Sequence, residues 1–372
     1  MKNRSTQTQK RDEERPTHAR DVQHAEWDSF LQDNPLGQYP QSSTWARYKK
    51  TSGWNCLRHV IRRDGKIRGG FQLLWKPTRF GRIGYVSKGP VAQDEDPRLV
   101  DELVSELTNS GRRLRLLAIV VQPPDRGWLT AGRLRAPLFL PNRVLEIITA
   151  TLMIDVTGGA PAIEARMRKT TRKYLRRAVR GKVCVREGGE KDLELFFALM
   201  LETCKRQGVA PNPADPAALK ALWKTEGKGV RCRLTFAEHG GKAIAGLFCI
   251  GFGETLTLWK KGSLPEHLPK RPVELLYHES LVWAQSSGYR FCNLGSMSRN
   301  IAERLLAGKE LTEKEQRSLD WFNLGFGGAP LLMPQASLHF PIQALSLGYR
   351  LLTSNQLTLR LFSRWVRGLE AG

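Results

Sequence analysis

The order of the predicted secondary-structure elements is the same in both halves of this 372-residue chain. In each half, three strand-like runs with alternating apolar residues precede a helix and a further strand. A unit repeated at a separation of about 175 residues is too long for a solenoid of small repeats, and it favours two similar α/β (α+β) domains packed side by side. The cleft between two such domains is the default position for a functional site.

Turn and cap signals delimit the elements of this repeated unit. The Asp-Gly pair at 64–65 predicts a hairpin. Serines before Thr44 predict a helix start, and Pro97 and Gly111 predict the beginning and the end of another helix. The first half has predicted helices at 21–34, 42–50 and 96–111 and strands within 56–75, 82–90 and 114–122. The second half has predicted strands at 144–156, 182–189, 230–241, 242–253, 255–262 and 289–295 and helices at 167–181, 192–208, 213–227 and 272–288.

A strongly basic helix follows the first strand of the second half. Residues 166–182 contain nine Lys or Arg and no Asp or Glu. Like charges at positions i and i+4 repel each other, so a surface helix that serves only solubility normally mixes both signs. This helix is therefore predicted to bind a polyanion. Residues with helical spacing form the face that is predicted to dock on a core: Met167, Thr171, Tyr174, Leu175 and Ala178.

The charge of the whole chain points to the same class of partner. A formal net charge of +23 favours nucleic acid, phosphorylated precursors or an anionic membrane surface. The six cysteines form no C-x-x-C motif, so a zinc site is not expected, and scattered thiols suit a reducing cytoplasm. The longest apolar run, Leu116–Val121, is too short to span a membrane, and no signal peptide is visible.

Four stretches of the sequence together resemble the Fem-type (FemAB- and FemX-like) non-ribosomal peptidyltransferases. They are "QSSTWARYKK", "SKGPVAQDED", "RKTTRKYLRRA", and "GYRFCNLGSMS" followed by "LDWFNLGFGG". The resemblance implies two tandem acetyltransferase-like (GNAT) domains. It also implies transfer of an amino acid from an aminoacyl-tRNA to an amine of a nucleotide- or lipid-linked cell-envelope precursor, with amide-bond formation.

The expected division of the chain combines this resemblance with the repeated unit. Residues 1–20 are predicted to be a disordered basic lead-in, 21–155 the first GNAT-like domain, 156–340 the second, and 341–372 a C-terminal helical segment. The protein is expected in the cytoplasm or at the inner face of the cytoplasmic membrane. Its donor is expected to be an amino acid bound to a carrier. No resident cofactor is expected for the protein itself.

Attack of an amine on an ester needs a deprotonated nucleophile, an aligned donor, and groups that stabilise the oxyanion. The resemblance points to the acidic loop after "KGP" for the base, and to Lys49 for the precursor phosphates. It also points to Asn323, which stands where many relatives have a lysine. The candidate catalytic residues are Asp94, Asp96, Lys261 and Asn323, and the candidate substrate-binding residues are Arg47, Lys49, Lys260, Arg168, Arg172 and Arg176.

Two other functions are compatible with the sequence. A GNAT-type N-acyltransferase of surface polysaccharide synthesis is one, although neither half contains the Q/R-x-x-G-x-G/A turn that binds the pyrophosphate of CoA. The other is a non-catalytic module that binds polyanions or an anionic membrane. For that module, residues 355–369 are predicted to form an amphipathic helix.

Overall fold

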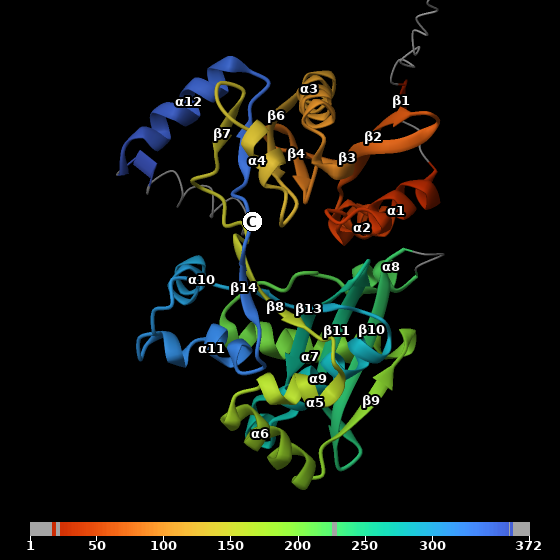
Figure 1. Ribbon diagram of the computed structural model, residues 1–372, viewed down its shortest axis with the longest axis vertical. Helices are drawn as coiled ribbons and strands as arrows, with labels where there is room; N and C mark the ends of the chain where they lie inside the picture. Colours follow the sequence, from red (N-terminus) through yellow and green to blue (C-terminus); the bar gives the residue numbers. More distant parts are fainter. Residues whose placement is uncertain (1–16, 20–22, 225–228, 357, 360–372) are drawn as a thin grey trace, which may run out of the picture.

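The structure is a computed structural model that describes residues 17–19, 23–224, 229–356 and 358–359. Its described strands form two mixed sheets, one above the other in Figure 1. The first sheet has the order β1-β2-β3-β4-β6-β15-β7, with β5 paired to β3, and the second has the order β14-β8-β13-β12-β11-β10-β9. The predicted α/β class with two similar sheets is confirmed.

The bounds of the strands come directly from the backbone pairing. Those of the first sheet are β1 Thr17–Ala19, β2 Asn55–Arg63, β3 Lys66–Thr78, β4 Gly81–Ser87, β5 Val91–Ala92, β6 Leu116–Gln122, β7 Phe139–Pro141 and β15 Ser337–His339. Those of the second are β8 Ala150–Asp155, β9 Cys184–Gly188, β10 Arg231–His239, β11 Lys242–Phe252, β12 Thr255–Ser263, β13 Phe291–Ser296 and β14 Ala329–Leu332.

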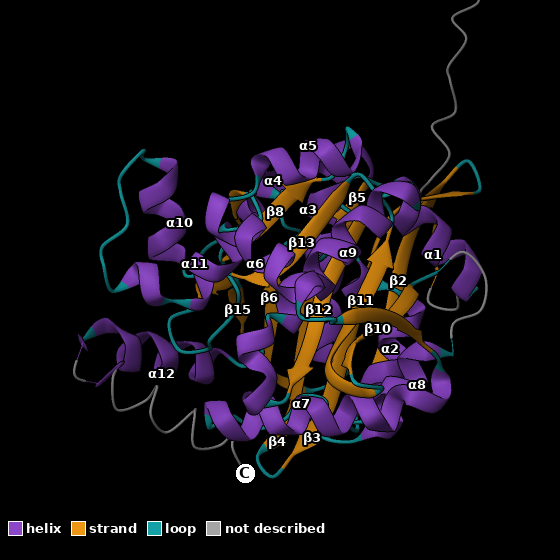
Figure 2. Ribbon diagram, turned by 90° about the horizontal axis from the view of Figure 1, so that it is seen from below, coloured by secondary structure: helices purple, strands orange, loops and turns teal. Residues whose placement is uncertain are grey.

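The described helices surround both sheets (Figure 2). They are α1 His24–Asp33, α2 Ser43–Lys50, α3 Pro97–Arg113, α4 Trp128–Arg133, α5 Gly159–Arg166, α6 Lys169–Arg180, α7 Leu193–Gln207, α8 Pro216–Trp223, α9 Pro272–Ser286, α10 Arg299–Leu306, α11 Leu319–Leu324 and α12 Gln343–Ser354. The short 3-10 turns are η1 Tyr39–Gln41, η2 Gln93–Glu95, η3 Glu190–Asp192, η4 Pro265–Lys270 and η5 Glu315–Arg317.

The repeated β-β-β-α-β unit is present in both sheets. In the first it consists of β2, β3, β4, α3 and β6, and in the second of β10, β11, β12, α9 and β13. In each unit the three strands pair antiparallel, and the strand after the helix returns parallel to the third strand. The parallel return requires a crossover connection, which the helix provides.

Two local signals act as predicted, and one does not. Asp64 and Gly65 take positive φ angles of 52° and 72° in the turn between β2 and β3, as a hairpin of this sequence requires. The Ser42 side chain caps α2 by accepting a hydrogen bond from the backbone N–H of Trp45. Gly111, however, does not end α3. It lies inside that helix, where an added Cβ would be 2.7 Å from Ile119 Cδ1, so it allows close packing on β6.

The sheets exchange strands near the predicted division of the chain. β8 lies before residue 156 yet belongs to the second sheet, and β15 returns to the first sheet between β6 and β7.

The two ends of the chain also bear on the predicted division. Residues 1–20 are predicted to be disordered, but residues 17–19 form the strand β1 against β2. The described part of the C-terminal segment contains α12, while most of the predicted amphipathic helix at 355–369 lies outside the described residues. The division into domains stays a prediction.

One apolar core is shared by the two halves. It joins Trp27, Trp45 and Tyr48 of the first half to Phe196 and Phe248 of the second, together with their apolar neighbours. Separate cores lie between α3 and the first sheet and between α9 and the second sheet. The shared core holds the facing surfaces of the two halves in one arrangement, which positions the site between them.

Replacing Gly262 in β12 by alanine is expected to destabilise the protein by about 2–3 kcal/mol through overpacking. The added Cβ would lie 2.3 Å from the backbone carbonyl carbon of Leu199 and 2.4 Å from the backbone nitrogen of Met200 in α7, and backbone atoms cannot rotate away. Gly348→Ala is the control, because nothing lies within 4 Å of its added Cβ. Denaturant unfolding of both variants checks the prediction, and equal stabilities would contradict it.

Candidate functional site

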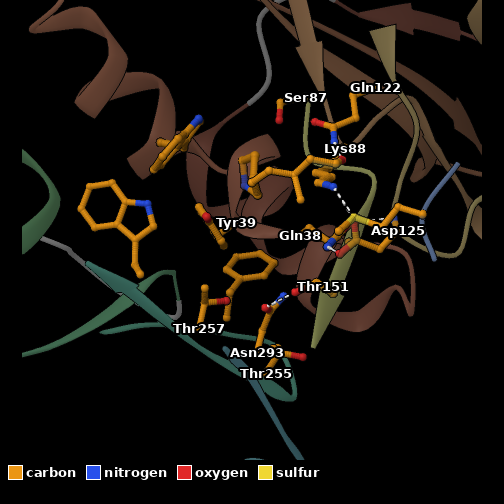
Figure 3. Close-up of a pocket in the computed structure, with 18 of the residues that line it drawn as sticks. Gln38, Tyr39, Ser87, Lys88, Gln122, Asp125, Thr151, Thr255, Thr257 and Asn293 are labelled. Carbon is orange, nitrogen blue, oxygen red and sulfur yellow. Dashed lines mark hydrogen bonds and ion pairs between the residues drawn. The ribbon is translucent and has the colours of Figure 1, made fainter. Parts of the chain in front are cut away.

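A cleft of about 770 Å³ lies between the two halves of the protein. Residues from the α1–α2 region, β4 and β6 line one wall, and residues from β8, β12 and β13 line the other. Figure 3 shows this arrangement, with Tyr39, Lys88 and Gln122 from the first half facing Thr257 and Asn293 from the second. The cleft is therefore formed only when both sheets are in place.

An aromatic wall with two lysines occupies one end of the cleft. The Trp259 ring packs edge-on against Trp45 and Tyr48, with ring centroids 6.0 and 5.7 Å away. Lys49 Nζ lies 5.5 Å from the ring centroids of both Trp45 and Tyr48, and Lys260 Nζ lies 5.4 Å from that of Trp259. We call Lys49 and Lys260 the cleft lysines; one comes from each half of the chain.

The cleft lysines form a positive site without a compensating acid. Neither makes an ion pair with a carboxylate among the described residues, whereas both are partly buried. Burial lowers the pKa of Lys49, and the nearby charges of Lys76 and Lys260 lower it further. Burial also lowers the pKa of Lys260. Two lysines held close together despite their lowered pKa values are typical of a site for a phosphate or another anion.

Buried hydrogen bonds fix the helix that carries Lys49. The Gln41 side chain, fully buried just before α2, donates to the Ser87 carbonyl over 2.6 Å and accepts from the Gln72 N–H over 2.7 Å. The Gln41 carbonyl accepts a third bond from the indole N–H of Trp27 at 2.7 Å. These bonds tie the start of α2 to β3 and β4, so Lys49 projects from a rigid element.

An acidic group lies at the other end of the cleft. Asp125 forms an ion pair with Lys88, and it accepts a 2.7 Å hydrogen bond from the Gln38 side chain (Figure 3). The Gln38 side chain in turn accepts from the backbone N–H of Asp125 at 3.0 Å. Asp125 and Lys88 are only 13% and 12% exposed, so the pair is held in a defined geometry.

The tyrosines of the cleft act as neutral hydrogen-bonding groups. Burial raises the pKa of Tyr48 to about 12, and burial with the charge of Asp125 raises the pKa of Tyr39 further. The Tyr85 hydroxyl donates to the Gln122 side chain over 2.9 Å, and burial raises its pKa as well. None of these three phenols is therefore a base near neutral pH.

A β-bulge in β12 sets which face of the sheet each of two adjacent lysines of this strand takes. The pairing with β11 shifts between Phe248 and Cys249, opposite the stretch 258–260. Lys260 lines the cleft, whereas Lys261 lies on the opposite face of the sheet, where its Nζ donates to the Tyr277 hydroxyl at 3.2 Å. Adjacent residues of one strand thus serve two different surfaces.

On that opposite face, Lys261 belongs to an aromatic and polar group. Its Nζ lies 5.2 Å from the ring centroid of Tyr277 and 5.1 Å from that of Phe322. Asn323 follows Phe322 in α11 and is buried, and its Oδ1 has no hydrogen-bond partner among the described residues. We call Lys261, Tyr277, Phe322 and Asn323 the opposite-face cluster.

The basic helix α6 lies next to this cluster. The backbone N–H of Arg168 donates to the Gly325 carbonyl at 2.9 Å, directly after α11. The Arg168 guanidinium stacks on the Trp321 ring at 3.4 Å from its centroid. Met167, Thr171, Leu175 and Ala178 are buried, as predicted, and Tyr174 is covered by the Arg271 guanidinium at 3.8 Å.

Two strands of the second sheet separate beside the cleft. β12 and β13 pair only from Thr255 to Thr257 and from Phe291 to Asn293 in the described structure. Beyond this point β12 pairs with β11 and β13 with β8. Asn293, the last residue of β13 that pairs with β12, lines the cleft and accepts a 2.5 Å hydrogen bond from Thr151. The separation of the strands begins directly at the cleft wall.

The structure brings together some of the predicted site residues and not others. Lys49 and Lys260 lie in the cleft, and Lys261, Asn323 and Arg168 lie on the opposite face. The remaining predicted residues do not line the cleft. Asp94 lies in η2, Asp96 caps α3 and pairs with Arg63, Arg47 is exposed on α2, and Arg172 and Arg176 lie along α6.

Sequence reasoning missed the polar pair of the cleft and its aromatic wall. Lys88 stands inside the "SKGP" stretch, whose resemblance points instead to the acids that follow it. Asp125 follows two prolines after β6, and a carboxylate just past the end of a strand is a usable signal. Trp259 directly precedes Lys260. Strand alternation places Trp259 on the same face of β12 as Thr257, two residues earlier.

Comparison with known proteins agrees with this architecture. The FemAB family model matches residues 22–130, and the model of the acetyltransferase (GNAT) domain matches residues 165–300. The chain thus carries a FemAB-family segment in its first half and a GNAT domain in its second. The two matches fall on the two halves that form the cleft walls.

The curated relatives that the chain matches are distant in sequence. A lipid II:glycine glycyltransferase of Staphylococcus aureus (strain MRSA252) is 25% identical over 199 residues, which cover 50% of this chain and 47% of the relative. The match thus spans about half the length of this curated relative. The crystal structure of FemX has a TM-score of 0.74 at 16% identity and covers 91% of this chain and all of that one.

A second solved structure shows the same tandem architecture. It is a tandem GNAT protein from the clavulanic acid biosynthesis pathway, with a TM-score of 0.51 at 12% identity, covering 88% of this chain and 99% of that one. Among its described residues, the chain contains no helix that is long and apolar enough to cross a bilayer. In the same residues, no three His, Cys, Asp or Glu side chains are grouped to hold a metal ion.

Proposed function

We propose that the protein transfers an amino acid from an aminoacyl-tRNA to an amine of a phosphorylated or lipid-linked cell-envelope precursor. The observation that carries this proposal is the placement of cationic sites on both faces of the second sheet, next to the point where β12 and β13 separate. Two polyanionic substrates can then approach from opposite sides. The proposed reaction takes place in the cytoplasm, because aminoacyl-tRNA is found there.

The acceptor is proposed to bind in the cleft, with its phosphates on Lys49 and Lys260. The cleft lysines lack carboxylate partners in the described chain and are partly desolvated, which strengthens their attraction for a phosphate. The aromatic wall of Trp45, Tyr48 and Trp259 supplies apolar surface beside them. Lipid II in the name of the Staphylococcus aureus relative agrees with a lipid-linked acceptor.

Asp125 takes the place of the predicted acids near the amine. Asp94 and Asp96 do not line the cleft in the described structure, and the Asp96 side chain is engaged in capping α3. Asp125 lines the cleft in an ion pair with Lys88, so it can orient an incoming ammonium and accept its proton. We therefore assign the amine-positioning role to Asp125.

The aminoacyl ester is proposed to lie against the opposite-face cluster. Attack on the ester carbonyl by the amine forms a C–N bond and places negative charge on the carbonyl oxygen. Lys261 and Asn323 are then the groups that stabilise this charge. Breaking the C–O bond releases the tRNA hydroxyl, while the proton of the amine passes to a carboxylate or to solvent. No covalent enzyme intermediate is needed.

The basic helix α6 is proposed to hold the tRNA. Replacing Lys173, Arg176, Arg177 and Arg180 together by glutamine is expected to weaken tRNA binding and to reduce the slope of log affinity against log salt by about 3, since each phosphate contact contributes about 0.9 at most. Arg168 is left unchanged, because it stacks on Trp321. Fluorescence anisotropy with labelled tRNA at several salt concentrations measures the slope.

A control for this experiment removes the same charge elsewhere. Exposed cations of the first half, Lys66, Arg98, Arg112 and Arg115, are replaced by glutamine in the matched variant. We expect its salt slope to equal that of the unmodified protein. Equal slopes for all three proteins would contradict the assignment of α6.

The test of the whole proposal is a transfer assay. Purified protein is incubated with tRNA charged with labelled amino acids and with lipid-linked or nucleotide-linked muropeptide, and the product is identified by mass spectrometry. Mass addition of one aminoacyl residue to the precursor is the expected result. No addition with any aminoacyl-tRNA, together with turnover of an acyl-CoA, would contradict it.

The second candidate is a GNAT-type N-acyltransferase of surface polysaccharide synthesis, and it is favoured by the neutral Asn323. Many members of the family have a lysine at this position. Asn323→Lys is expected to preserve or raise aminoacyl transfer if the donor is an aminoacyl-tRNA, because the added cation strengthens the oxyanion site. Loss of acyl transfer in a variant with an unchanged circular dichroism spectrum would support the second candidate. Steady-state kinetics with both donors decides between them.

A further inference from the structure

The helix α12 presents an apolar surface that nothing in the described structure covers. Leu347 and Leu351, one helical turn apart, are 60% and 64% exposed, and Leu345 and Leu352 on its flank are also exposed. On the opposite side of the helix, Tyr349 and Thr353 are buried against the first half of the protein. We call Leu347 and Leu351 the leucine face. These two apolar side chains, with the less exposed Leu345 and Leu352 nearer to Tyr349, stand where a surface helix normally carries polar residues.

Cations border the leucine face. Arg350 precedes Leu351, and its guanidinium donates to the Pro137 carbonyl at 3.1 Å. Arg143 of the neighbouring loop donates to the Thr353 carbonyl at 3.0 Å. Neither arginine forms an ion pair with a carboxylate within the described parts of the chain. Both line a groove of about 240 Å³ between β7 and α12.

Acidic residues are missing from the segments that build this surface. Residues 126–145 and 321–369 contain no Asp or Glu, although the chain has 36 of them. The first range includes β7 and Leu138, which is 50% exposed in the loop that contacts Arg350. The second includes β15 and the whole of α12. The surface is thus apolar and positive, and α12 lies at the periphery of the molecule in both ribbon views (Figures 1 and 2).

We propose that α12 docks the protein on an anionic phospholipid surface. In this arrangement the leucine face enters the acyl-chain boundary, and Arg350 with Arg143 contacts the lipid phosphates. An amphipathic helix with an apolar face and flanking cations binds membranes in this way, with strength that grows with buried apolar area and with anionic lipid. The absence of acids favours a lipid surface, because protein interfaces usually pair charges of both signs at their rim.

This proposal goes beyond the transfer reaction and does not depend on it. The leucine face belongs to neither the cleft nor the opposite-face cluster, so membrane docking is measured without any substrate. A protein docked through α12 keeps its cleft, which lies between the sheets, open to a precursor held in the same membrane.

The test uses the full-length protein and vesicles of phosphatidylcholine with or without phosphatidylglycerol. Co-sedimentation is expected to show binding to vesicles with phosphatidylglycerol and much weaker binding to those without it. Leu347→Gln with Leu351→Gln is expected to lower the partition coefficient at least about tenfold, since two exposed leucines no longer become buried. Arg350→Gln is expected to lower it a few-fold and only on anionic vesicles.

A matched variant carries Leu195→Gln and Leu306→Gln, which replace exposed leucines of α7 and α10. Its partition coefficient is expected to stay within twofold of that of the unmodified protein. Vesicle binding that is the same in all variants, or absent, overturns the proposal. Analytical ultracentrifugation tests whether a second copy of the chain covers this face instead. A dimer that is lost in the Leu347/Leu351 variant, together with no vesicle binding, would show that it does.

Discussion

Replacing Lys49 by methionine is expected to raise the KM for a phosphorylated precursor by about 10- to 100-fold, with a small change in kcat. A charge-assisted contact to a phosphate contributes about 1.5–3 kcal/mol, and it is made equally in the ground state and the transition state. Lys49 is partly buried beside the packed rings of Trp45 and Tyr48 and has no carboxylate partner among the described residues, so its charge is available to the ligand. Initial-rate kinetics with varied precursor concentration measures both parameters.

The adjacent residue Lys50 provides the control for this variant. It lies in the same helix, α2, but it is exposed and does not line the cleft. Lys50→Met is expected to leave the KM within about twofold. Equal effects of the two substitutions would mean that general positive charge, and not the cleft, attracts the precursor.

The pH dependence of binding gives an independent readout. The pKa values of Lys49 and Lys260 are both lowered from that of ordinary lysine, chiefly by burial. Since only the protonated amines attract phosphate, precursor affinity is expected to fall as the pH rises through these lowered values, below the range in which exposed lysines lose their charge. In the Lys49→Met variant this fall is expected to become smaller.

Replacing Lys261 by methionine is expected to lower kcat by about 100-fold, with little change in the KM for the precursor. Loss of a group that stabilises the oxyanion typically costs about 10²–10³ in kcat, because the charge develops only in the transition state. Lys261 belongs to the opposite-face cluster. Its Nζ lies beside the Phe322 ring, which directly precedes Asn323 in the sequence, and it contacts the Tyr277 hydroxyl. Single-turnover kinetics with bound aminoacyl-tRNA isolates the chemical step.

The comparison variant is Lys260→Met, one residue earlier in β12. The β-bulge places Lys260 in the cleft, so this change is expected to raise the KM and to leave kcat nearly unchanged. The two substitutions remove the same charge from the same strand. If both changed only the KM, or both changed only kcat, the assignment of the two faces would be wrong.

The elements of the fold were largely predictable because they follow from local patterns. Alternation, the Asp-Gly turn and the capping serine each act within a few residues, and the hairpin of β2 and β3, the helix α2 and the basic helix α6 form as expected. Gly111 was misjudged, because a glycine after a helical run signals an end only when no neighbouring element approaches closely. The contact of α3 with Ile119 is such an approach.

The site was only partly predictable, because its members come from distant parts of the chain. Lys49 and Lys260 are 211 positions apart, and the shared core around Trp45 and Trp259 brings them together. Asp125 carries no motif of its own, and its position just past β6 becomes informative only with the ion pair that it forms with Lys88 in the cleft. Asp96 stands in a conspicuous acidic loop, but it serves the N-terminus of α3.

The sequence by itself determined the repeated β-β-β-α-β order, the positive charge and the single-sign helix α6, since propensity, alternation and charge are properties of neighbouring residues. Only the tertiary structure decided on which side of β12 each lysine lies. A period of two predicts opposite faces for neighbours, but a bulge shifts that phase, and the bulge depends on pairing with β11. The tertiary structure likewise decided that β15 returns to the first sheet and that the leucines of α12 stay uncovered, because both depend on which surfaces meet after the chain has folded.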